Sequence, residues 1–348
     1  MKAWVCAFLS VLSLAACGDA VAVPARTPSQ SVAAVTPSAV TAPCRLPVSW
    51  QIFDTAKRTW STHAGFLTVP GNGLSEDPAG VMVENGTRTP RPPYLRGVGP
   101  PRYINGRWLP GGVTSPDGRQ YAYSDRDYAI HLVDVATADD RIIGGTGPWG
   151  PAGFTSDGLY LNRVRITHTN IAGDMETPLG LWVVNPGGGQ PRKVAVSPDL
   201  MWEVAGKAAW GLDRPAGDPL GQGPDRLLRV DLGGGAAAEW FHQPQANSID
   251  LVGFDGQGLP FVHFEEGADP RTNVVRHVNG PDQSVEVFRD IGFRPQGPLA
   301  NDKRGTWFSG FGATEPFSSP VFLYNTSGHI KPAGEIAGAQ IDVAGGCA

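Results

Sequence analysis

From Cys44 to the C-terminus, short apolar runs alternate with polar positions. Gly, Pro, Asp and Asn gather between these runs, and no segment shows a convincing helical period of 3.6 residues in its apolar positions. Alternation over about four to eight residues is typical of a strand with one buried face. The pattern therefore predicts an all-β domain over residues 44–348.

One unit recurs along this domain: an apolar run that ends in Asp or Asn and is followed by a polar or Gly-rich turn. Asp and Asn suit a strand exit because their side chains can bond the backbone of the turn. The copies end at Asp54, Asp134, Asn185, Asp231, Asn279 and Asn325, with a weaker seventh at Asn105. The last four intervals are 51, 46, 48 and 46 residues. This spacing indicates an internal repeat of the length of a propeller blade.

A second motif precedes several copies. Its members are Ser115-Pro116-Asp117-Gly118, Thr155-Ser156-Asp157-Gly158 and the degenerate Asp255-Gly256-Gln257-Gly258. Pro, Asp and Gly in this order make a tight turn between two strands.

The stretch from Ser115 to Asp134 closely resembles one blade of the TolB-like or WD40-like propeller repeat. In that family the Ser-Pro-Asp-Gly turn links the innermost strand to the second strand, and the Val-Asp pair closes the third. The resemblance is close over residues 111–145, fair over 150–196 and only patterned over 200–337. It departs from the family over residues 66–110, where the prolines suggest a long irregular insertion: Pro90, Pro92, Pro93, Pro100 and Pro101.

The strand exits predict a propeller of seven four-stranded blades, with six as the alternative. A β-sandwich with fortuitous spacing is the competing fold. A propeller commonly closes its ring by completing one blade from both chain ends, which removes free sheet edges. We expect residues 339–343 to supply one strand of that blade and residues 46–53 to supply the others.

The N-terminus carries Lys2, an apolar run to Leu14 and the ending Leu-Ala-Ala-Cys. This arrangement indicates a secretory signal, and the ending resembles the bacterial lipobox, in which the Cys is acylated. We expect residues 1–16 to be a lipoprotein signal peptide and Cys17 to carry the lipid. The alternative is an ordinary signal peptide with an accidental Cys. The domain would then be anchored in a bacterial cell membrane by lipid, on its extracytoplasmic face.

Residues 17–43 are rich in Ala, Pro, Ser, Thr and Val and have almost no charge, so they are expected to form a disordered tether. After the signal is removed and Cys17 is lipidated, Cys44 and Cys347 remain. An even remainder in an oxidising compartment predicts one disulfide between them. Two unrelated free thiols are the alternative.

Composition and motifs exclude several classes of binding and catalytic site. The formal net charge is -5, and no Lys/Arg cluster indicates a nucleic-acid surface. The sequence contains no lipase-type Gly-x-Ser-x-Gly, no His-Glu-x-x-His and no Cys-x-x-Cys. We therefore predict no catalytic residue, no metal site and no cofactor from motifs.

The chain has 10 Trp residues, and most are expected to be wedged between blades. Trp60, Trp108 and Trp149 are the first candidates for a binding rim at the mouth of the propeller. The leading functional expectation is a membrane-anchored module that binds a protein or envelope ligand. The alternative is a lyase or hydrolase with a site dispersed over several blades. Converging His, Asp, Arg or Glu side chains at the centre would favour the enzyme, and an aromatic rim would favour binding.

Overall fold

The computed structural model describes residues 40, 42–54, 59–80, 100–109, 111–125, 127–145, 147–169, 173–213, 223–267, 272–290, 293–312 and 318–347. The chain divides into two units, Met1–Thr36 and Pro37–Ala348, and every described residue belongs to the second. The predicted signal peptide, Cys17 and most of the predicted tether lie outside the described residues. Among the described residues, no helix has the length and apolar character needed to cross a membrane.

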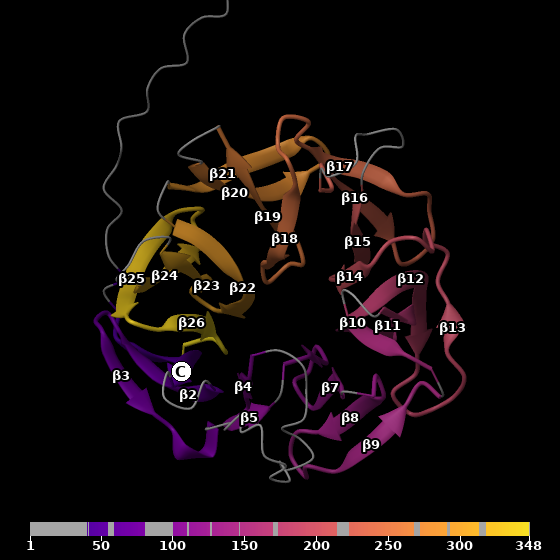
Figure 1. The fold of residues 1–348 in the computed structure, drawn as a ribbon, viewed down its shortest axis with the longest axis horizontal. Coiled ribbons are helices and arrows are strands. Elements are labelled where there is room, and N and C mark those ends of the chain that lie inside the picture. Colours follow the sequence, from indigo (N-terminus) through magenta and orange to yellow (C-terminus); the bar gives the residue numbers. More distant parts are fainter. Residues whose placement is uncertain are drawn as a thin grey trace, which may run out of the picture. The chain divides into compact units, whose positions relative to one another are not determined.

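Six four-stranded antiparallel sheets are arranged around a common axis, so the fold is a six-bladed β-propeller (Figure 1). Blade 1 combines the two ends of the unit, in the order β26 (Gln340–Val343), β1 (Cys44–Asp54), β2 (Thr59–Val69) and β3 (Gly73–Glu76). Blade 2 contains β6 (Val113–Thr114), β7 (Gln120–Ser124), β8 (Ile130–Asp134) and β9 (Asp140–Ile143). Blade 3 contains β10 (Trp149–Thr155), β11 (Gly158–Thr169), β12 (Gly173–Val184) and β13 (Arg192–Lys193).

The remaining blades repeat the same order, from the innermost strand outward (Figure 1). Blade 4 contains β14 (Trp202–Ala205), β15 (Ala208–Asp213), β16 (Arg226–Asp231) and β17 (Ala238–His242). Blade 5 contains β18 (Ile249–Phe254), β19 (Pro260–Glu266), β20 (Thr272–Gly280) and β21 (Gln283–Asp290). Blade 6 contains β22 (Phe293–Asp302), β23 (Gly305–Gly312), β24 (Ser318–Asn325) and β25 (Ile330–Ala337). A short 3-10 helix, η1 (Pro78–Gly80), follows blade 1, and a hairpin of β4 (Arg102–Ile104) and β5 (Arg107–Leu109) precedes blade 2.

Both chain ends close the ring, as predicted. The C-terminal strand β26 is the innermost strand of blade 1 and pairs with β1 over Val48–Gln51. Cys44 and Cys347 form a disulfide across a sequence separation of 303 residues, with their Cα atoms 5.7 Å apart. The backbone N–H of Cys347 also donates to Asp302 Oδ2 at 2.8 Å. The predicted cysteine pair therefore fixes the end of the chain beside both blade 1 and blade 6.

The prediction of seven blades is wrong, and the alternative of six is right. Five of the Asp or Asn exits follow third strands, but Asp54 ends the second strand of blade 1. The weak copy at Asn105 is the turn of the β4–β5 hairpin, which has only two strands in the part of the chain that the structure describes. Both copies have the local chemistry of a strand exit, and this chemistry does not reveal how many strands pair beside it.

The hairpin is wedged between blades 1 and 2. On one side Tyr103 and Trp108 pack against Phe66 of blade 1. On the other side Ile104 and Leu109 pack against a cluster that contains Tyr121 of blade 2. The hairpin therefore fills a place in the ring between two blades without forming a complete blade itself.

The predicted turns have the expected geometry. Ser115-Pro116-Asp117-Gly118 links the innermost strand β6 to β7, and Ser115 Oγ donates to Asp117 Oδ1 at 2.6 Å. Gly118 has φ +68°, a conformation that favours glycine. At the third-strand exit, Asp134 Oδ1 accepts from the backbone N–H of Thr137 at 2.9 Å. The side chains of Asp117 and Asp134 therefore stabilise these two turns as the sequence indicated.

Apolar clusters between neighbouring blades form the core. Six of the described tryptophans are at most 5% exposed, in line with the expectation that they are wedged between blades: Trp50, Trp108, Trp149, Trp202, Trp210 and Trp307. Trp202 illustrates how polar groups are satisfied there, because Asn162 of blade 3 bonds both its backbone N–H and its carbonyl, at 3.0 and 2.7 Å. This pair of bonds joins blade 3 to blade 4.

Candidate functional site

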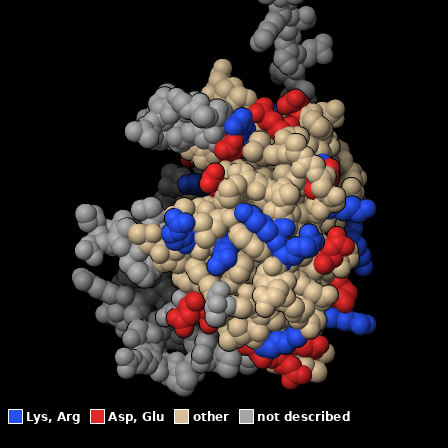
Figure 2. All heavy atoms as spheres, turned by 90° about the vertical axis from the view of Figure 1, so that its right-hand side faces the viewer, with Lys and Arg blue, Asp and Glu red and all other residues tan. Residues whose placement is uncertain are grey.

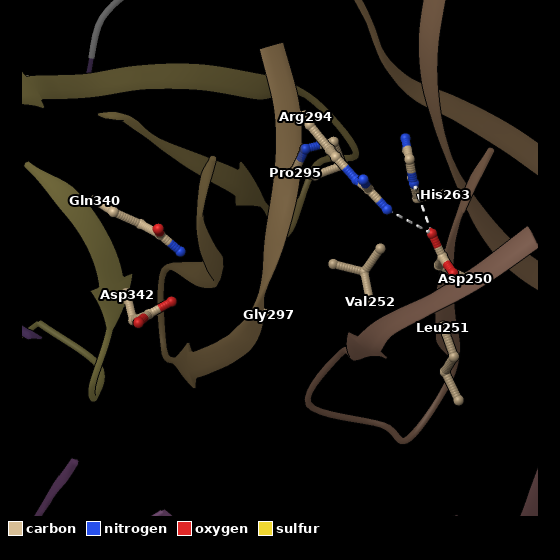
Figure 3. Close-up of a pocket in the computed structure, with 9 residues that line it drawn as sticks. All are labelled: Asp250, Leu251, Val252, His263, Arg294, Pro295, Gly297, Gln340 and Asp342. Atoms are coloured by element: carbon tan, nitrogen blue, oxygen red, sulfur yellow. Dashed lines mark hydrogen bonds and ion pairs between the residues drawn. The ribbon is translucent and has the colours of Figure 1, made fainter. Parts of the chain in front are cut away.

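A cavity of about 290 Å³ opens at the axis side of blades 5, 6 and 1. Its lining comes from the innermost strands β18, β22 and β26 together with one residue of β19 (Figure 3). The lining residues are Asp250, Leu251, Val252, His263, Arg294, Pro295, Gly297, Gln340 and Asp342. Charged and amide side chains from three blades therefore meet at one place.

Two irregular innermost strands shape this cavity. The register of β18 shifts between Leu251 and Gly253, and that of β22 shifts between Gln296 and Ala300. A bulge re-aims the side chains of the strand that contains it. At the second bulge Gly297 lies so close to blade 5 that an added Cβ would be 2.8 Å from the carbonyl oxygen of Val252. Glycine at this position allows the two blades to approach each other.

Asp250 is the centre of the polar network on the blade 5 side. Its Oδ2 atom lies 3.3 Å from His263 Nδ1 and accepts a hydrogen bond from Arg294 Nη2, also at 3.3 Å (Figure 3). The hydrogen bond from His263 lowers the pKa of Asp250 most, and the charges of His263 and Arg294 lower it further against the effect of burial. Asp250 is therefore ionised over the physiological pH range.

His263 positions this carboxylate. Its side chain is 3% exposed, and its Nε2 atom lies 2.9 Å from Asn273 Oδ1. Both ring nitrogens thus face protein oxygen atoms, which holds the ring in one orientation. The side chains of Arg294 and Asp250 are 58% and 50% exposed, so these two can reach a ligand and His263 acts through Asp250.

Asp342 lies on the opposite side of the cavity, on β26 (Figure 3). Burial raises its pKa from 3.8 to about 6, while the charge of Arg102 acts in the other direction. Glu203, on the innermost strand β14, behaves similarly: loss of solvation raises its pKa from 4.5 to about 7 although its side chain is exposed. Loss of solvation near the axis thus raises the pKa of both carboxyls toward neutral pH.

These groups allow two kinds of chemistry. Arg294, Asp250 and Gln340 can bond the hydroxyl, amide or charged groups of a polar ligand, and Asp342 can exchange a proton near neutral pH. No Ser, Cys or Lys lines the cavity within the described chain. The described residues also contain no group of three or more His, Cys, Asp or Glu side chains that could hold a metal ion.

The three tryptophans proposed from the sequence occupy different places. Trp108 lies in β5, is 5% exposed and donates from Nε1 to Asp77 Oδ2 at 3.0 Å. Trp149 lies in the innermost strand β10 and is 4% exposed. The backbone of Trp60 lies in β2, but its side chain falls outside the described residues. The structure does not bring Trp108 or Trp149 into the axis cavity.

A second cavity, of about 270 Å³, lies where blade 1, the hairpin and blade 2 meet, and Trp108 is part of its wall. Its lining also includes Asp77, Arg107 and Asp134. The backbone amides of its own turn, above all that of Thr137, lower the pKa of Asp134. This carboxylate therefore has a structural role in the turn.

The outer surface shows where charged side chains gather. In Figure 2, basic side chains form a broken band across the face that carries the right-hand blades of Figure 1, with acidic side chains above and below. Blade 3 contributes the exposed cations Arg163, Arg165, Arg192 and Lys193, which form no ion pair with any described residue. Arg163 and Lys193 lie over the ring of Trp182 at 5.9 and 5.4 Å.

Large apolar side chains on the described surface are scattered. The exposed ones are Ile142, Met201 and Val285, at 64%, 45% and 46%. Ile142 and Val285 belong to blades 2 and 5, and Met201 directly precedes blade 4. They form no aromatic rim, and single exposed apolar residues are normal on soluble proteins.

Sequence reasoning missed the residues of the axis cavity, because they come from strands far apart in the chain and share no local motif. A signal was nevertheless present. Innermost strands are mostly apolar, yet Asp250, Asp342 and Glu203 each stand between two apolar neighbours. A charged residue in the middle of such a strand marks a position that faces the axis.

No protein-family model matches the chain, and no curated protein matches it. Solved structures share its fold. A TolB-type protein of Agrobacterium tumefaciens is 11% identical, with a TM-score of 0.46, and the match covers 86% of this chain and 92% of that one. An oligogalacturonate lyase in complex with manganese is 12% identical, with a TM-score of 0.46, over 84% and 85% of the two chains. The oligogalacturonate lyase of Vibrio parahaemolyticus is 11% identical, with a TM-score of 0.44, over 82% and 84%. These likenesses concern the fold alone.

Proposed function

We propose that the protein is a lipid-anchored, extracytoplasmic binding module that takes a small polar ligand, such as an envelope glycan fragment or a short peptide, into the axis cavity. The observation that carries this proposal is the convergence of Asp250, Arg294 and Asp342 from three blades on one cavity. A few well-placed polar groups in a concave site are what fixes the orientation of a small ligand.

The same geometry narrows the earlier expectation of a protein or envelope ligand. A protein that docks on a rim needs a cluster of exposed aromatic or apolar side chains. The described surface offers only scattered ones, and Trp108 and Trp149 are buried. The cavity is the better candidate, because its charged groups are half exposed and already held in place by hydrogen bonds.

Anchoring is part of the proposal and rests on the sequence. Lipid on Cys17 would hold the propeller at a membrane, with residues 17–43 as the tether. Metabolic labelling with a radioactive fatty acid should mark the wild-type chain and leave Cys17→Ser unmarked. Equal labelling of the two chains would refute the anchor without affecting the cavity.

The binding test uses a panel of glycan fragments and short peptides, read by ligand-observed NMR with the purified full chain in detergent. We expect at least one panel member to bind saturably. Arg294→Ala should lower the affinity for that panel member about tenfold, the factor for one hydrogen bond to a charged group. Arg165→Ala, which removes an exposed Arg far along the chain on blade 3, is the matched control and should leave the affinity unchanged. Equal affinities of all three proteins would overturn the proposal.

An enzyme that acts on such a ligand is the second candidate, and one observation favours it. Two carboxyls in the same cavity have pKa values that are moved apart: that of Asp250 is lowered and that of Asp342 is raised to about 6. Such a separation is the arrangement by which one carboxyl serves as acid and another stays ionised. Converging His, Asp and Arg side chains also meet the criterion set from the sequence for a dispersed catalytic site.

Turnover separates the two candidates. The panel is incubated with the wild type and with Asp342→Asn, and the mixtures are analysed for cleaved products by mass spectrometry. For an enzyme, products form with the wild type and disappear with Asp342→Asn while saturable binding remains. For a binding module, every panel member is recovered intact from both proteins.

A further inference from the structure

The β4–β5 hairpin, which interrupts the repeat of blades, holds a cation beside the axis. Arg102 lies in β4, and in Figure 1 this strand is on the axis side of the hairpin, between blade 1 and β7. Its Nη2 atom donates to the carbonyl oxygen of Leu299 in the bulge of β22, at 2.9 Å. Its Nη1 atom is buried and has no hydrogen-bond partner in the described structure. Burial lowers the pKa of this guanidinium, whose ordinary value is so high that it stays charged.

A second unused donor lies near this cation. Tyr121 of β7 is 0% exposed, and its hydroxyl is buried without a partner among the described residues. Gly112 leaves room for this hydroxyl, since an added Cβ there would be 2.8 Å from Tyr121 Oη. Burial raises the pKa of Tyr121 well above 10 while the charge of Arg102 acts against this, so the hydroxyl keeps its proton.

Two buried donors without acceptors are costly, because each loses its bonds to water, at about 1–3 kcal/mol for a neutral group and more for a charged one. Tyr123, two residues along the same strand, avoids this cost by donating to Asp140 Oδ2 at 3.2 Å. Arg102 Nη1 and Tyr121 Oη have no such acceptor in the described structure. The two groups lie within electrostatic reach of each other. An acceptor with negative charge would satisfy both at once.

The axis cavity and Arg102 share neighbouring residues, although neither Arg102 nor Tyr121 lines the cavity. Asp342, which lines the cavity, lies within electrostatic reach of Arg102 but forms no ion pair with it in the described structure. Gly297 lines the cavity two residues before Leu299, the residue that holds Arg102. The bulge of β22 therefore contributes both to the cavity and to the position of Arg102. The hairpin also lies beside the end of β26, since the backbone N–H of Tyr103 donates to the carbonyl oxygen of Ala344 at 2.8 Å.

We infer that Arg102 and Tyr121 bind an oxyanion, a carboxylate or phosphate, that is the charged group of the ligand in the axis cavity. This inference rests on the proposed function, because it names the chemistry of that ligand. Arg102 Nη1 and Tyr121 Oη donate to the oxyanion. The guanidinium supplies the charge, and the hydrogen bonds are stronger than neutral ones because the acceptor is ionised.

Asp342 couples this site to pH. The other charged groups that line the cavity are Asp250 from β18 and Arg294 from β22, with His263 behind Asp250. Arg102 from β4 lies within electrostatic reach of Asp342. Of these, Asp342 changes charge near neutral pH, since its pKa is raised to about 6. Above that pH its carboxylate repels a bound oxyanion, and below it the repulsion is lost. Oxyanion affinity is therefore expected to rise as the pH falls through 6.

The test titrates the full chain in detergent with inorganic phosphate, with gluconate and with neutral glycerol at constant ionic strength, by isothermal titration calorimetry. Phosphate and gluconate represent the two sources of the oxyanion, and at least one should bind saturably while glycerol does not. Tyr121→Phe should lower the affinity for that anion about tenfold, the factor for one hydrogen bond to a charged group. Tyr123→Phe is the matched control and should leave anion affinity unchanged. Asp342→Asn should bind the anion more tightly at pH 7.5 and equally at pH 5.

Tyr121→Phe is expected to fold, because it removes a hydroxyl that has no partner, whereas Arg102→Gln is a supporting variant that can fail to fold. Non-saturable anion signals, or equal anion affinities of the wild type and Tyr121→Phe, would overturn the inference and leave water as the partner of the two donors. That result is distinct from failure of the proposed function, which is read from Arg294→Ala with the glycan and peptide panel.

Discussion

Buried polar groups are satisfied differently in two regions: the interface of blades 3 and 4, and the junction where blade 1, the hairpin and blade 2 meet. Between blades 3 and 4, the buried amide of Asn162 satisfies both backbone polar groups of Trp202. At the junction Arg102 and Tyr121 keep buried donors without partners. On the other side of blade 1, next to blade 6, the Cys44–Cys347 disulfide closes the ring. Buried atoms without a partner also occur in blades 3 and 4: the indole N–H groups of Trp149 and Trp210, Asp225 Oδ1 and Arg226 Nε. Arg226 nevertheless forms an ion pair with Asp213 at 2.6 Å, and Asp225 Oδ2 lies 3.3 Å from His242 Nε2, whereas Arg102 forms no ion pair in the described structure.

This difference indicates two uses of buried polar groups. Where the blade repeat continues, polar side chains join neighbouring blades and contribute to stability. Beside blade 1, a covalent bond contributes that stability on the blade 6 side, and polar side chains on the hairpin side are left for another partner. The expected outcomes below test each side of the difference, from the largest effect on the free energy of unfolding to the smallest.

Removing the disulfide should have the largest effect. Because Cys44 and Cys347 are separated by 303 residues, Cys44→Ser with Cys347→Ser should lower the free energy of unfolding by on the order of 5 kcal/mol on the chain-entropy model. Guanidinium unfolding followed by tryptophan fluorescence measures this loss. Dithiothreitol should destabilise the wild type by a similar amount and leave the double variant unchanged. If the double variant unfolded at the same guanidinium concentration as the wild type, packing alone would hold the ring closed.

Asn162→Ala should have the second-largest effect and lower the free energy of unfolding by about 2–4 kcal/mol. The reason is that the buried backbone N–H and carbonyl of Trp202 would both lose their hydrogen-bond partner. Asn279→Ala is the matched control: this residue is exposed, and its replacement should change the free energy of unfolding by less than about 0.5 kcal/mol. Equal losses in the two variants would contradict the role assigned to the interblade amide.

The pH dependence of stability should reveal Glu203. Its pKa is raised by lost solvation from 4.5 to about 7, so the folded state binds the proton more tightly than the unfolded chain. The contribution of this residue to stability is therefore greatest below about pH 4.5 and falls as the pH rises to 7. Glu203→Gln should raise the thermal midpoint at pH 8 and leave it unchanged at pH 4. The increase should be modest because the side chain is exposed, and a decrease at pH 8 would contradict the account of the axis.

Tyr121→Phe should have the smallest effect on stability, from zero to a slight gain of less than about 0.5 kcal/mol, since an unsatisfied buried hydroxyl is removed. The same change at Tyr123, whose hydroxyl bonds Asp140, should cost about 1 kcal/mol. Differential scanning calorimetry compares the two. A larger loss in Tyr121→Phe than in Tyr123→Phe would mean that the Tyr121 hydroxyl has a structural partner.

Local patterns predicted much of the fold. The Ser115–Gly118 turn and the strand exit at Asp134 follow from side chains that bond the backbone within a few residues, so their sequence signal is complete. Ring closure followed from the resemblance to a propeller, and the Cys44–Cys347 disulfide followed from an even number of remaining cysteines in a chain that we expect to be exported. Lipid on Cys17 stays a prediction, because that residue lies outside the described chain.

The blade count and the site were beyond local patterns for different reasons. Asn105 has the chemistry of a strand exit. In the described chain, however, β4 pairs with β5 and with no further strand, so no full blade forms there. The cavity joins Asp250, Arg294 and Asp342 through the curvature of the whole ring, which no short segment encodes. Trp108 and Trp149 were expected at a rim, yet packing inside the ring buries both.

The most direct test of the central claim compares wild type with Arg294→Ala by isothermal titration calorimetry, using the panel glycan fragment or peptide that shows the strongest saturable NMR response. The account predicts an affinity about tenfold weaker for the variant with an unchanged thermal unfolding midpoint. Equal affinities, or a lowered midpoint with no change in affinity, would contradict the claim that the axis cavity is the binding site.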